Sequence, residues 1–427
     1  MLPQLRRLEQ KYRAEISIVG VHSGKFTEER SSASIRDASL RLNAVHPTIN
    51  DRQFRVWRSY AVRAWPTLVA ISPSGYVVGM RAGEFEAEAL APFIDRVIEE
   101  ARASGTLDTR RIHFPLDEPS SAPGMLAFPG KVATDGDRIA IADSGHHRVV
   151  IGTVERDAAR MTVERVVGGA AAGFRDGGDP LFDNPQGLVF HGDTLYVADA
   201  GNHAIRAVAL STGGSRTIAG NGTQARAAAD IGAGALNSPW DVAYDEGRLY
   251  VAMAGTHQLW TVDVTTGATA VHSGSGAEEL HDGAHASAAL AQPMGLSLSA
   301  GSIYFADSES SAIRVADRDP QGGVRTIVGT GLFDFGDADG SGDAVRLQHP
   351  QAVACAPDGR LLVADCYNGS LRWIEPGSGR TQTWLRGLSE PSGVAISGRR
   401  AFVAESNRHR IMVARLDSAE AMELRFV

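Results

Sequence analysis

Residues 195–208 read LYVADAGNHAIRAV, and this stretch decides the fold because it recurs along the chain. An apolar run ends in Ala-Asp, a turn containing Gly or Asn follows, and a second apolar run begins after a histidine. Each copy is preceded by a proline that opens a further apolar run. These prolines are residues 129, 185, 239, 293, 350 and 391. The period is therefore about 54 residues and finally 41, and such a period with several short strands per unit predicts a β-propeller.

Each repeat is expected to form four strands. VATDG and GLVFHG are examples of the inner strand, IAIAD and LYVAD of the second, HRVVIGTV and AIRAVAL of the third, and SRTIAG and VRTIVG of the fourth. The sixth unit finds its fourth strand in AMELRFV, residues 421–427. Six units predict six blades, and because a single repeat cannot bury its faces, the ring is expected to fold as one cooperative core.

The chain has 427 residues, which is too long for one ordinary domain. Residues 1–105 alternate helical and strand patterns, with an amphipathic helix at LPQLRRLEQKYRAE, a short strand at ISIVGVHS, a hairpin of TLVAIS and YVVGM, and a closing helix at EAEALAPFIDRVIEEARA. This order is typical of an α/β sandwich. Residues 106–124 carry Pro, Ser and charge and are expected to be a linker, and residues 125–427 are expected to be the propeller.

The net charge of −8 is unevenly distributed. Residues 1–110 hold 16 Lys and Arg against 13 Asp and Glu, a net of +3, which leaves residues 111–427 with −11. An acidic propeller argues against nucleic acid as a partner. No apolar run reaches the length of a membrane helix, and two cysteines fit a reducing compartment, so a cytoplasmic protein with no membrane partner is expected.

The core apolar-V-A-D-x-G-N-H-x-I/L resembles the NHL repeat, and residues 64–79, AWPTLVAISPSGYVVG, resemble the cis-proline hairpin of the thioredoxin-like fold. Together, over nearly the whole chain, they resemble the NHL repeat-containing protein 2-like family. The resemblance implies a thioredoxin-like α/β domain followed by an all-β six-bladed NHL-type propeller. The further β-rich C-terminal segment associated with that family does not follow the sixth repeat.

The resemblance further implies that Trp65, Pro66 and Thr67 form the cis-proline loop, which in thioredoxin-like proteins faces a redox-active C-x-x-C pair. No such pair is present, because the two cysteines are Cys355 and Cys366. Thioredoxin-like proteins place a helix-kinking proline five residues after the second cysteine, and Pro3 fits that position. By that count the cysteine pair and the first strand would fall before Met1, which leaves the α/β domain truncated and with an unpaired strand edge.

Cys355 and Cys366 lie in ACAPDGRLLVADCYNG, on two strands joined by an Asp-Gly turn. Pairing 355 with about 362 separates the sulfurs by about four residues, or ~13 Å. A disulfide needs Cα atoms within ~7 Å. We therefore expect two ordinary, unpaired propeller cysteines.

Two sets of residues recur in the repeats, and the histidine set invites a metal interpretation. The acidic set, at the end of the second strands, is Asp143, Asp199, Asp307, Asp365 and Glu405; the histidine set, in the turns that follow, is His147, His203, His257 and His409. Equivalent positions on different blades do not converge on one ion, whose ligands must lie within ~2.1 Å. We expect structural roles instead, with carboxylates capping the following turn and histidines bonding locally, and we expect no metal and no cofactor.

The long loops between blades are the best candidates for a binding surface, because loops on a rigid scaffold commonly carry binding. The candidate residues are Phe174, Asp176, His281, Asp282, Phe333, Phe335 and Asp339. Residues 337–348 partly match a calcium loop, but position 12 is Gln348 and not Glu. The Asp-Gly pairs recur before successive blades, which favours turns. A protein or a small ligand of unknown identity is the expected partner at this loop face.

Three functions are compatible with these patterns. The first is a protein-interaction scaffold that is redox-inactive in the form given. The second is a thiol–disulfide oxidoreductase whose C-x-x-C lies upstream of Met1. The third and weakest is a metal-dependent propeller lyase or hydrolase, because the inner strands, such as GLVFHG and AVACAP, offer too few ligands.

Overall fold

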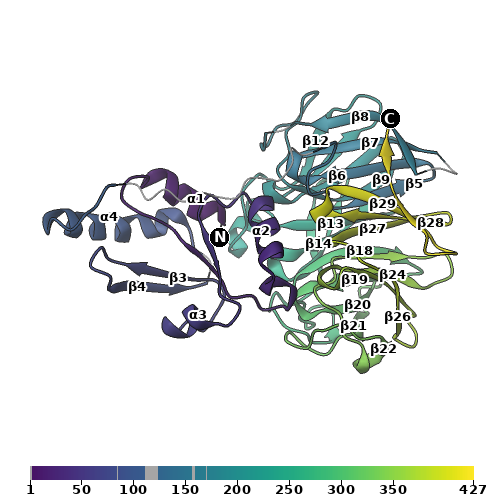
Figure 1. Cartoon of the computed structure of the whole chain (residues 1–427). Coiled ribbons are helices and arrows are strands. Elements are labelled where there is room, and N and C mark those ends of the chain that lie inside the picture. The colour runs from purple at the N-terminus through teal and green to yellow at the C-terminus, as the bar shows by residue number, and fades with distance from the viewer. Residues whose placement is uncertain (1, 84, 111–123, 156–158, 170) are drawn as a thin grey trace. The chain divides into compact units, whose positions relative to one another are not determined.

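The computed structural model describes residues 2–83, 85–110, 124–155, 159–169 and 171–427. The chain divides into two compact units, Met1–Ala122 and Pro123–Val427. Figure 1 shows helices α1 to α4 in the first unit and the blades of the propeller in the second. Most of the predicted linker, residues 111–123, lies outside the described residues.

The first unit is a mixed α/β unit. Its elements are α1 (Leu2–Lys11), β1 (Gly20–His22), η1 (Glu28–Arg30), α2 (Ser32–Arg41), β2 (Thr48–Asn50), α3 (Arg55–Ser59), β3 (Thr67–Ile71), β4 (Val77–Ala82) and α4 (Ala87–Ala103). The predicted hairpin is confirmed as β3 and β4, which pair antiparallel. β1 pairs in parallel with β2, a strand that the sequence did not predict because it has only three residues.

The strands of this unit form two separate two-stranded sheets. Leu5 and Leu8 of α1 and Tyr12, just after it, pack against Phe85 and against Leu90 of α4, and all five side chains are buried. Leu68 of β3 and Ile18 pack on the same cluster. Within the described residues, β1 pairs only with β2 and β3 only with β4, so each sheet is left with unpaired edges.

The second unit has six blades of antiparallel strands, as predicted. Blades 1 to 3 consist of β5 (Val132–Asp135), β6 (Arg138–Asp143), β7 (Arg148–Val154) and β8 (Arg160–Gly168); β9 (Pro185–His191), β10 (Thr194–Asp199), β11 (Ala204–Ala209) and β12 (Ser215–Ala219); and β13 (Pro239–Asp245), β14 (Arg248–Met253), β15 (Gln258–Asp263) and β16 (Thr269–Ser273). Blades 4 to 6 consist of β18 (Pro293–Ser299), β19 (Ser302–Asp307), β20 (Ala312–Asp317) and β21 (Gly323–Val328); β23 (Ala352–Cys355), β24 (Leu361–Asp365), β25 (Ser370–Ile374) and β26 (Arg380–Arg386); and β27 (Pro391–Ser397), β28 (Arg400–Glu405), β29 (Arg410–Arg415) and β30 (Ala421–Glu423).

A short 3-10 turn follows the second strand of every blade. These turns are η2 (Ser144–His146), η3 (Ala200–Asn202), η4 (Ala254–Thr256), η5 (Ser308–Ser310), η7 (Cys366–Asn368) and η8 (Ser406–Arg408). The residue after each turn is left-handed, with φ between 50° and 56°. The turns therefore reverse the chain in the same way in all six blades.

The loops between blades are more regular than the sequence indicated. β17 (Gly283–Ala284) adds a fifth strand to blade 4, and β22 (Gly340–Ser341) adds one to blade 5. The loop before blade 3 contains α5 (Ala228–Gly232), and the loop before blade 5 contains η6 (Gly342–Ala344). Two of the three Asp-Gly pairs predicted as turns thus begin a short edge strand.

The C-terminal residues close the ring. The sequence assigned residues 421–427 to blade 6, but only β30 pairs there. The chain then crosses to blade 1, where β31 (Arg425–Phe426) pairs in parallel with β8. The assignment of the last residues to blade 6 alone was therefore wrong, and the first and last blades are joined by hydrogen bonds.

Apolar packing between blades explains the cooperativity expected of the ring. Six buried clusters lie between successive blades, and the sixth joins blade 6 to blade 1. In that last cluster Ile139 and Met161 of blade 1 contact Phe402 and Ile411 of blade 6. No blade can bury both of its faces without both neighbours.

No helix among the described residues is long and apolar enough to cross a membrane.

Candidate functional site

The turns after the second strands and the loops that join one blade to the next lie at the same end of the strands, because the strands of each blade run alternately up and down. We call this end the loop face. It contains both repeat sets predicted from the sequence and the candidate binding residues. Its geometry is built from three layers, which are buried carboxylates, inter-blade histidines and a ring of inner-strand residues at the axis.

The acidic repeat residues are fully buried and hold the chain before the inner strand in five of the six blades. Their side chains belong to Asp143, Asp199, Asp307, Asp365 and Glu405, each with an exposed fraction of 0%. They accept the backbone N–H of Ala127, Asp183, Ala291, Gln348 and Ser389, at 2.6 to 2.8 Å. The prediction that they cap the following turn was wrong, because the N–H donor lies 16 or 17 residues upstream and the turn donates only side-chain groups such as those of Asn202 and Asn368.

Buried arginines neutralise these carboxylates, and sequence reasoning missed them. Arg206, Arg314 and Arg372 are fully buried and contact Asp199, Asp307 and Asp365 at 2.7, 2.9 and 2.7 Å. Each arginine follows its aspartate by seven residues. In blades 1 and 6 the arginine follows by five residues instead, as in the Arg148–Asp143 and Arg410–Glu405 pairs at 2.7 Å. This recurring spacing was the signal that the sequence offered.

Three of the predicted loop residues belong to the same network. Asp176, Asp282 and Asp339 contact Arg206, Arg314 and Arg372, respectively, at 2.7, 2.9 and 2.7 Å. Each also accepts the backbone N–H of a threonine on the outer strand of its blade, namely Thr217, Thr326 and Thr383. The Asp-Gly pairs therefore fasten each loop to the blade that follows it.

Burial and hydrogen bonding move the pKa values of these groups in opposite directions. Burial is the largest influence on Asp199 and Asp365 and raises the pKa of each to about 6, against the opposing effect of their arginine partners. Burial also acts to raise the pKa of Asp282, but the N–H and hydroxyl of Thr326 together with Arg314 outweigh it, so the pKa is lowered. All three carboxylates are therefore ionised at neutral pH.

The histidines join neighbouring blades, so the prediction of local bonding was wrong. Nδ1 of His147, His203, His257 and His409 accepts the backbone N–H of Asn184, Ser238, Gln292 and Phe128, at 3.0 to 3.2 Å. The last of these bonds connects blade 6 to blade 1. Among the described residues no group of three or more His, Cys, Asp or Glu side chains is arranged to hold a metal ion.

A ring of inner-strand residues surrounds the axis, two positions after each repeat proline. Its members are Lys131, Gly187, Asp241, Gly295, Ala352 and Gly393. Cβ atoms built on its glycines meet backbone of the next blade, at 2.4 Å from Cα of Asp241, 2.5 Å from the carbonyl of Gln351 and 2.8 Å from Cα of Lys131. Only glycine fits at such close approaches. We call this set the axial ring.

One ion pair crosses the axial ring and links alternate blades. Nζ of Lys131, on blade 1, donates to the carbonyl of Gln351 on blade 5 and lies 3.7 Å from a carboxylate oxygen of Asp241 on blade 3. Asp241 also accepts the backbone N–H of Leu296 on blade 4, at 3.0 Å. Burial lowers the pKa of Lys131 and raises that of Asp241. The sequence marks these two as charged inner-strand residues, but their meeting depends on the closed ring.

The remaining loop-face candidates are partly exposed aromatic residues and one histidine. Phe333 has an exposed fraction of 69% and Phe174 of 42%, and the Phe174 ring lies 5.0 Å from the Arg206 guanidinium. Phe335 is half-buried and His281 is exposed. Because Asp176 and Asp339 hold the loops in place, the two exposed phenylalanines are presented from anchored chain.

In the α/β unit the Trp65–Pro66 peptide bond is cis, as predicted. The Trp65 indole N–H donates to the carbonyl of Ser23 at 2.8 Å, which ties the start of β3 to the end of β1. The Thr67 hydroxyl donates to the carbonyl of Ala64 at 2.7 Å. Trp65 is 49% exposed, so a large part of its ring remains open to solvent.

Asp51 holds the start of α3, and two aromatic rings of this region lie next to Trp65. Both carboxylate oxygens of Asp51 accept backbone N–H groups at the start of α3, at 2.7 to 3.1 Å. These bonds lower the pKa of Asp51 although burial acts to raise it. Trp57, on α3, lies 4.5 Å from Trp65 between ring centroids, and Phe54 lies 6.4 Å away.

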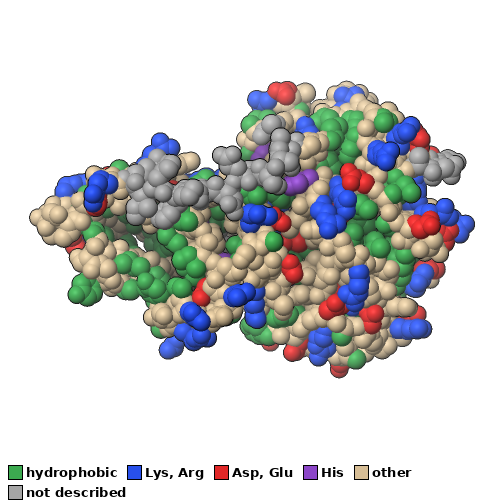
Figure 2. Space-filling model, in the orientation of Figure 1, with side chains coloured by type: hydrophobic (Ala, Val, Ile, Leu, Met, Phe, Trp, Pro, Cys, Tyr) green, Lys and Arg blue, Asp and Glu red, His purple; other side chains and the backbone are tan. Residues whose placement is uncertain are grey.

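The α/β unit exposes much of its apolar surface. Of the exposed large hydrophobic residues among the described part of the chain, the unit contributes Val19, Val21, Leu42, Val45, Ile49, Trp65, Ile71, Tyr76, Val77, Val78 and Met80. Val21 and Ile49 are cross-strand partners in the β1–β2 sheet. Figure 2 shows hydrophobic side chains at the surface over β3 and β4. Exposed apolar surface on this scale is typical of interaction sites.

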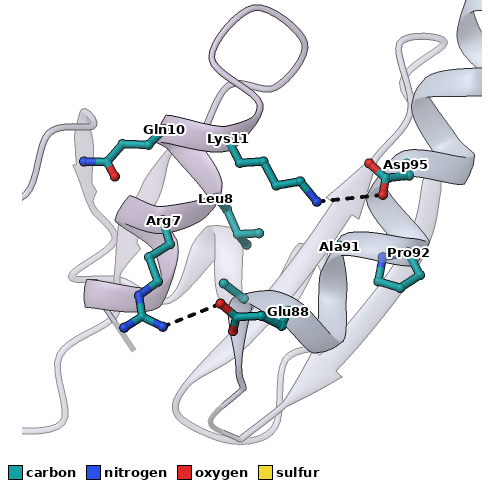
Figure 3. Close-up of a pocket in the computed structure, with 9 residues that line it drawn as sticks. Arg7, Leu8, Gln10, Lys11, Glu88, Ala91, Pro92 and Asp95 are labelled. Carbon is teal, nitrogen blue, oxygen red and sulfur yellow. Dashed lines mark ion pairs between the residues drawn. The ribbon is translucent and has the colours of Figure 1, made fainter. Parts of the chain in front are cut away.

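A groove of 730 Å³ lies between α1 and α4. Figure 3 shows two ion pairs across it, from Arg7 to Glu88 and from Lys11 to Asp95, at 3.6 and 3.9 Å. All four side chains are at least half exposed, so these pairs contribute little to stability. Leu8 and Ala91 also line the groove.

The two thiols lie far from any redox arrangement. Cys355 and Cys366 are not joined in a disulfide, as predicted, and Cys355 pairs with Leu361, next to the predicted partner position. Burial raises the pKa of Cys355, and Cys366 is 1% exposed. Both belong to blade 5, so the α/β unit has no thiol.

A mixed α/β unit followed by six blades with the same repeated contacts defines the chain as a two-unit β-propeller protein. The family model of the NHL repeat matches residues 236–261, in blade 3. The chain is 36% identical over 466 residues to Protein SUPPRESSOR OF QUENCHING 1, chloroplastic, of Arabidopsis thaliana, which covers 99% of this chain and 43% of that protein. It is 34% identical over 480 residues to NHL repeat-containing protein 2 of Gallus gallus, covering 98% of this chain and 64% of that protein.

The chain therefore belongs to the NHL repeat-containing protein 2 and SUPPRESSOR OF QUENCHING 1-like family. It spans less than two thirds of the length of these relatives. Among solved structures, the nidogen/laminin complex matches with a TM-score of 0.49 and 15% identity, over 66% of this chain and 92% of that one.

Proposed function

We propose that this protein is an interaction scaffold, in which the loop face of the propeller carries the partner site and the α/β unit is a redox-inactive thioredoxin-like domain. The observation that carries the proposal is the presentation of Phe333 and Phe174, both exposed, from loops whose aspartates pair with the buried arginines 206 and 372. Anchored loops lose little conformational entropy on binding, and aromatic side chains supply large contact areas. The partner is a protein with an apolar contact surface.

The state of the two thiols supports a redox-inactive role. A reactive cysteine needs a lowered pKa and access to solvent. Cys366 is buried, and the pKa of Cys355 is raised. Trp65, Pro66 and Thr67 resemble a cis-proline loop, but the sequence of the unit that carries them, residues 1–122, contains no cysteine.

A second candidate is a thiol–disulfide oxidoreductase, favoured by the exposed Trp65 ring next to that loop and by the unpaired edges of β1 and β3. This function requires a C-x-x-C pair in addition to the residues given. Reduction of insulin by dithiothreitol, measured with the protein isolated from its native host and with the 427-residue chain, separates the two. The scaffold predicts no catalysed reduction by either form, and catalysis by the host protein that the 427-residue chain lacks contradicts it.

The scaffold role is tested by capture of partner proteins with the full chain, followed by quantitative mass spectrometry. Proteins retained by the wild type are expected to be lost with Phe333→Ala and Phe174→Ala together. The matched control is Met422→Ala, which removes an exposed apolar side chain from the rim. Equal capture by all three forms contradicts a loop-face site, provided that thermal melting shows that each is folded.

A further inference from the structure

The outer edges of four blades are covered by other parts of the chain. β31 pairs with β8 of blade 1, β17 with β21 of blade 4, and β22 with β26 of blade 5. In blade 2, Gly177 forms a bridge with Ser215, with two bonds of 2.9 Å. The molecule itself thus shows what covers such an edge, which is a short extended segment.

In blades 2, 4 and 5 the covering segment has the same chemistry. It is the Asp-Gly pair, whose carboxylate accepts the outward backbone N–H of Thr217, Thr326 or Thr383. These threonines pair across the sheet with the buried arginines 206, 314 and 372. Backbone pairing, an anchored carboxylate and a buried guanidinium therefore occur together.

Blade 3 replaces this whole polar set with apolar residues. Met253 stands at the position of the buried aspartate, Trp260 at that of the arginine, and Val271 at that of the threonine, because Trp260 pairs with Val271. The loop before the blade forms α5, and its Asp230 accepts the backbone N–H groups of Arg226 and Ala227. That carboxylate is therefore not the one that covers β16.

The outer edge of β16 has no strand partner among the described residues, and its sheet ends there. By analogy with the outward N–H of Thr217, Thr326 and Thr383, the N–H of Val271 points away from the blade. Val271 is also 48% exposed. An edge of this kind is a ready template for pairing with another strand.

Among the described strands, blade 6 is the other blade whose outer strand is not covered by a further segment. Its outer edge is shorter than that of blade 3. β30 has three residues, and the chain leaves it at once for β31. β16 has five residues and no such crossing. The edge of β16 is therefore the longest uncovered one among the described outer strands of the propeller.

We propose that β16 binds an extended segment of a partner protein as a fifth strand of blade 3. The segment carries an aliphatic side chain, and not aspartate, beside Val271, because blade 3 has no arginine or threonine to hold a carboxylate. This proposal rests on the scaffold role but assigns it a second surface, at the rim and away from the loop-face phenylalanines.

The test is amide hydrogen exchange on the full chain, with and without a probe peptide of alternating threonine and valine between terminal lysines. The amide of Val271 is expected to exchange fast in the free protein and to become protected with saturating peptide. Fast exchange with and without peptide overturns the proposal. Protection of Val271 in the free protein at low concentration shows that the edge is already covered. Protection that grows with protein concentration identifies a second copy of the chain as the occupant. Either of these two results also overturns the proposal.

Two variants separate backbone pairing from side-chain contact. Val271→Pro removes the outward N–H without removing a bond to β15, which an edge strand tolerates, and it is expected to weaken peptide binding roughly five- to tenfold, the effect of one hydrogen bond. Val271→Thr keeps the N–H and is expected to weaken binding less. Equal affinity of Val271→Pro and wild type contradicts strand pairing.

The loop-face variant Phe333→Ala distinguishes this proposal from the scaffold role. It is expected to leave protection of Val271 by the peptide unchanged. Loss of partner capture with Phe333→Ala, together with no peptide protection at Val271, leaves the scaffold role standing and refutes the edge site. Peptide protection without any capture dependent on Phe333 and Phe174 refutes the loop-face site alone.

Discussion

Replacement of Arg314 by methionine is expected to be among the most destabilising single changes in the propeller. Arg314 is fully buried and donates to the carboxylates of Asp307 and Asp282, both at 2.9 Å, and to the carbonyls of Ala289 and His281, at 2.7 and 2.8 Å. Arg314→Met leaves the Asp307 carboxylate buried without its counter-charge. Removal of one partner from a buried ion pair costs about 3–5 kcal/mol of unfolding free energy.

The structure also predicts how the loss is repaired. Blade 3 has Met253 and Trp260 where blade 4 has Asp307 and Arg314, so the fold accepts an apolar version of this pair. The double variant Asp307→Met with Arg314→Met removes both buried charges and is expected to recover most of the loss. The coupling between the two changes should reach about 2 kcal/mol.

The assay is urea unfolding followed by circular dichroism, with the m-value checked for each variant. Arg325→Met, on the same blade but exposed, is the matched control and should stay within about 0.5 kcal/mol of the wild type. An Arg314→Met protein as stable as this control, or a double variant as unstable as the sum of its single changes, would refute the reasoning.

Three further predictions concern the loop face and the axis. Gly295→Ala places a Cβ 2.5 Å from the carbonyl oxygen of Gln351 and should clearly lower the melting temperature. The control Gly178→Ala, whose Cβ would have no atom within 4 Å, should leave it unchanged. Equal melting temperatures would contradict close packing of the axial ring. Lys131→Met leaves Asp241 buried and unpaired and should lower the free energy of unfolding by about 3 kcal/mol or more. Adding Asp241→Leu should recover much of this loss. Urea unfolding measures both variants, and no recovery in the double variant would contradict the pairing. The folded pKa values of Asp176, Asp282 and Asp339 lie below the ordinary 3.8, so the stability that these carboxylates contribute is complete above about pH 4 and is lost as the pH falls through the folded values. The folded pKa values of Asp199 and Asp365 are raised to about 6, so their protonation between about pH 7 and 4 increases the stability of the fold as the pH falls. Melting temperatures from pH 3 to 7 should therefore fall only at the acid end, and Asp282→Asn should reduce that fall; an unchanged acid limb in Asp282→Asn would be the contrary result.

Much of the fold could be predicted because its signals are local. The repeat prolines, the Ala-Asp strand ends and the turn histidines recur with a constant order, and that order predicted six blades and their strands. The β3–β4 hairpin and the cis Trp65–Pro66 bond were also predicted, from a short stretch of neighbouring residues. Strands of two or three residues, such as β2, β17 and β22, were missed because they carry too few residues for a period to show.

The candidate site was predicted only in part. Its residue types and repeat positions were visible, but their partners were not. His409 bonds to the N–H of Phe128, 281 residues away, and Asp143 bonds to Ala127 upstream and not to its own turn. The partner of a polar side chain depends on which donors the folded chain places near it. The distance between two residues along the sequence does not reveal which donors these are.

The sequence by itself determined the number of blades, the order of their strands and the residues at which each turn reverses, because these depend on apolar periodicity and on turn chemistry within a few residues. Only the tertiary structure decided that residues 425–426 leave blade 6 for blade 1, that Lys131 meets Asp241 across the axis, and that β16 keeps an open edge. The first two features depend on closure of the ring, which brings together positions separated by 110 to about 260 residues through packing between blades. The open edge depends on the loop before blade 3, which forms α5 and adds no strand to that blade.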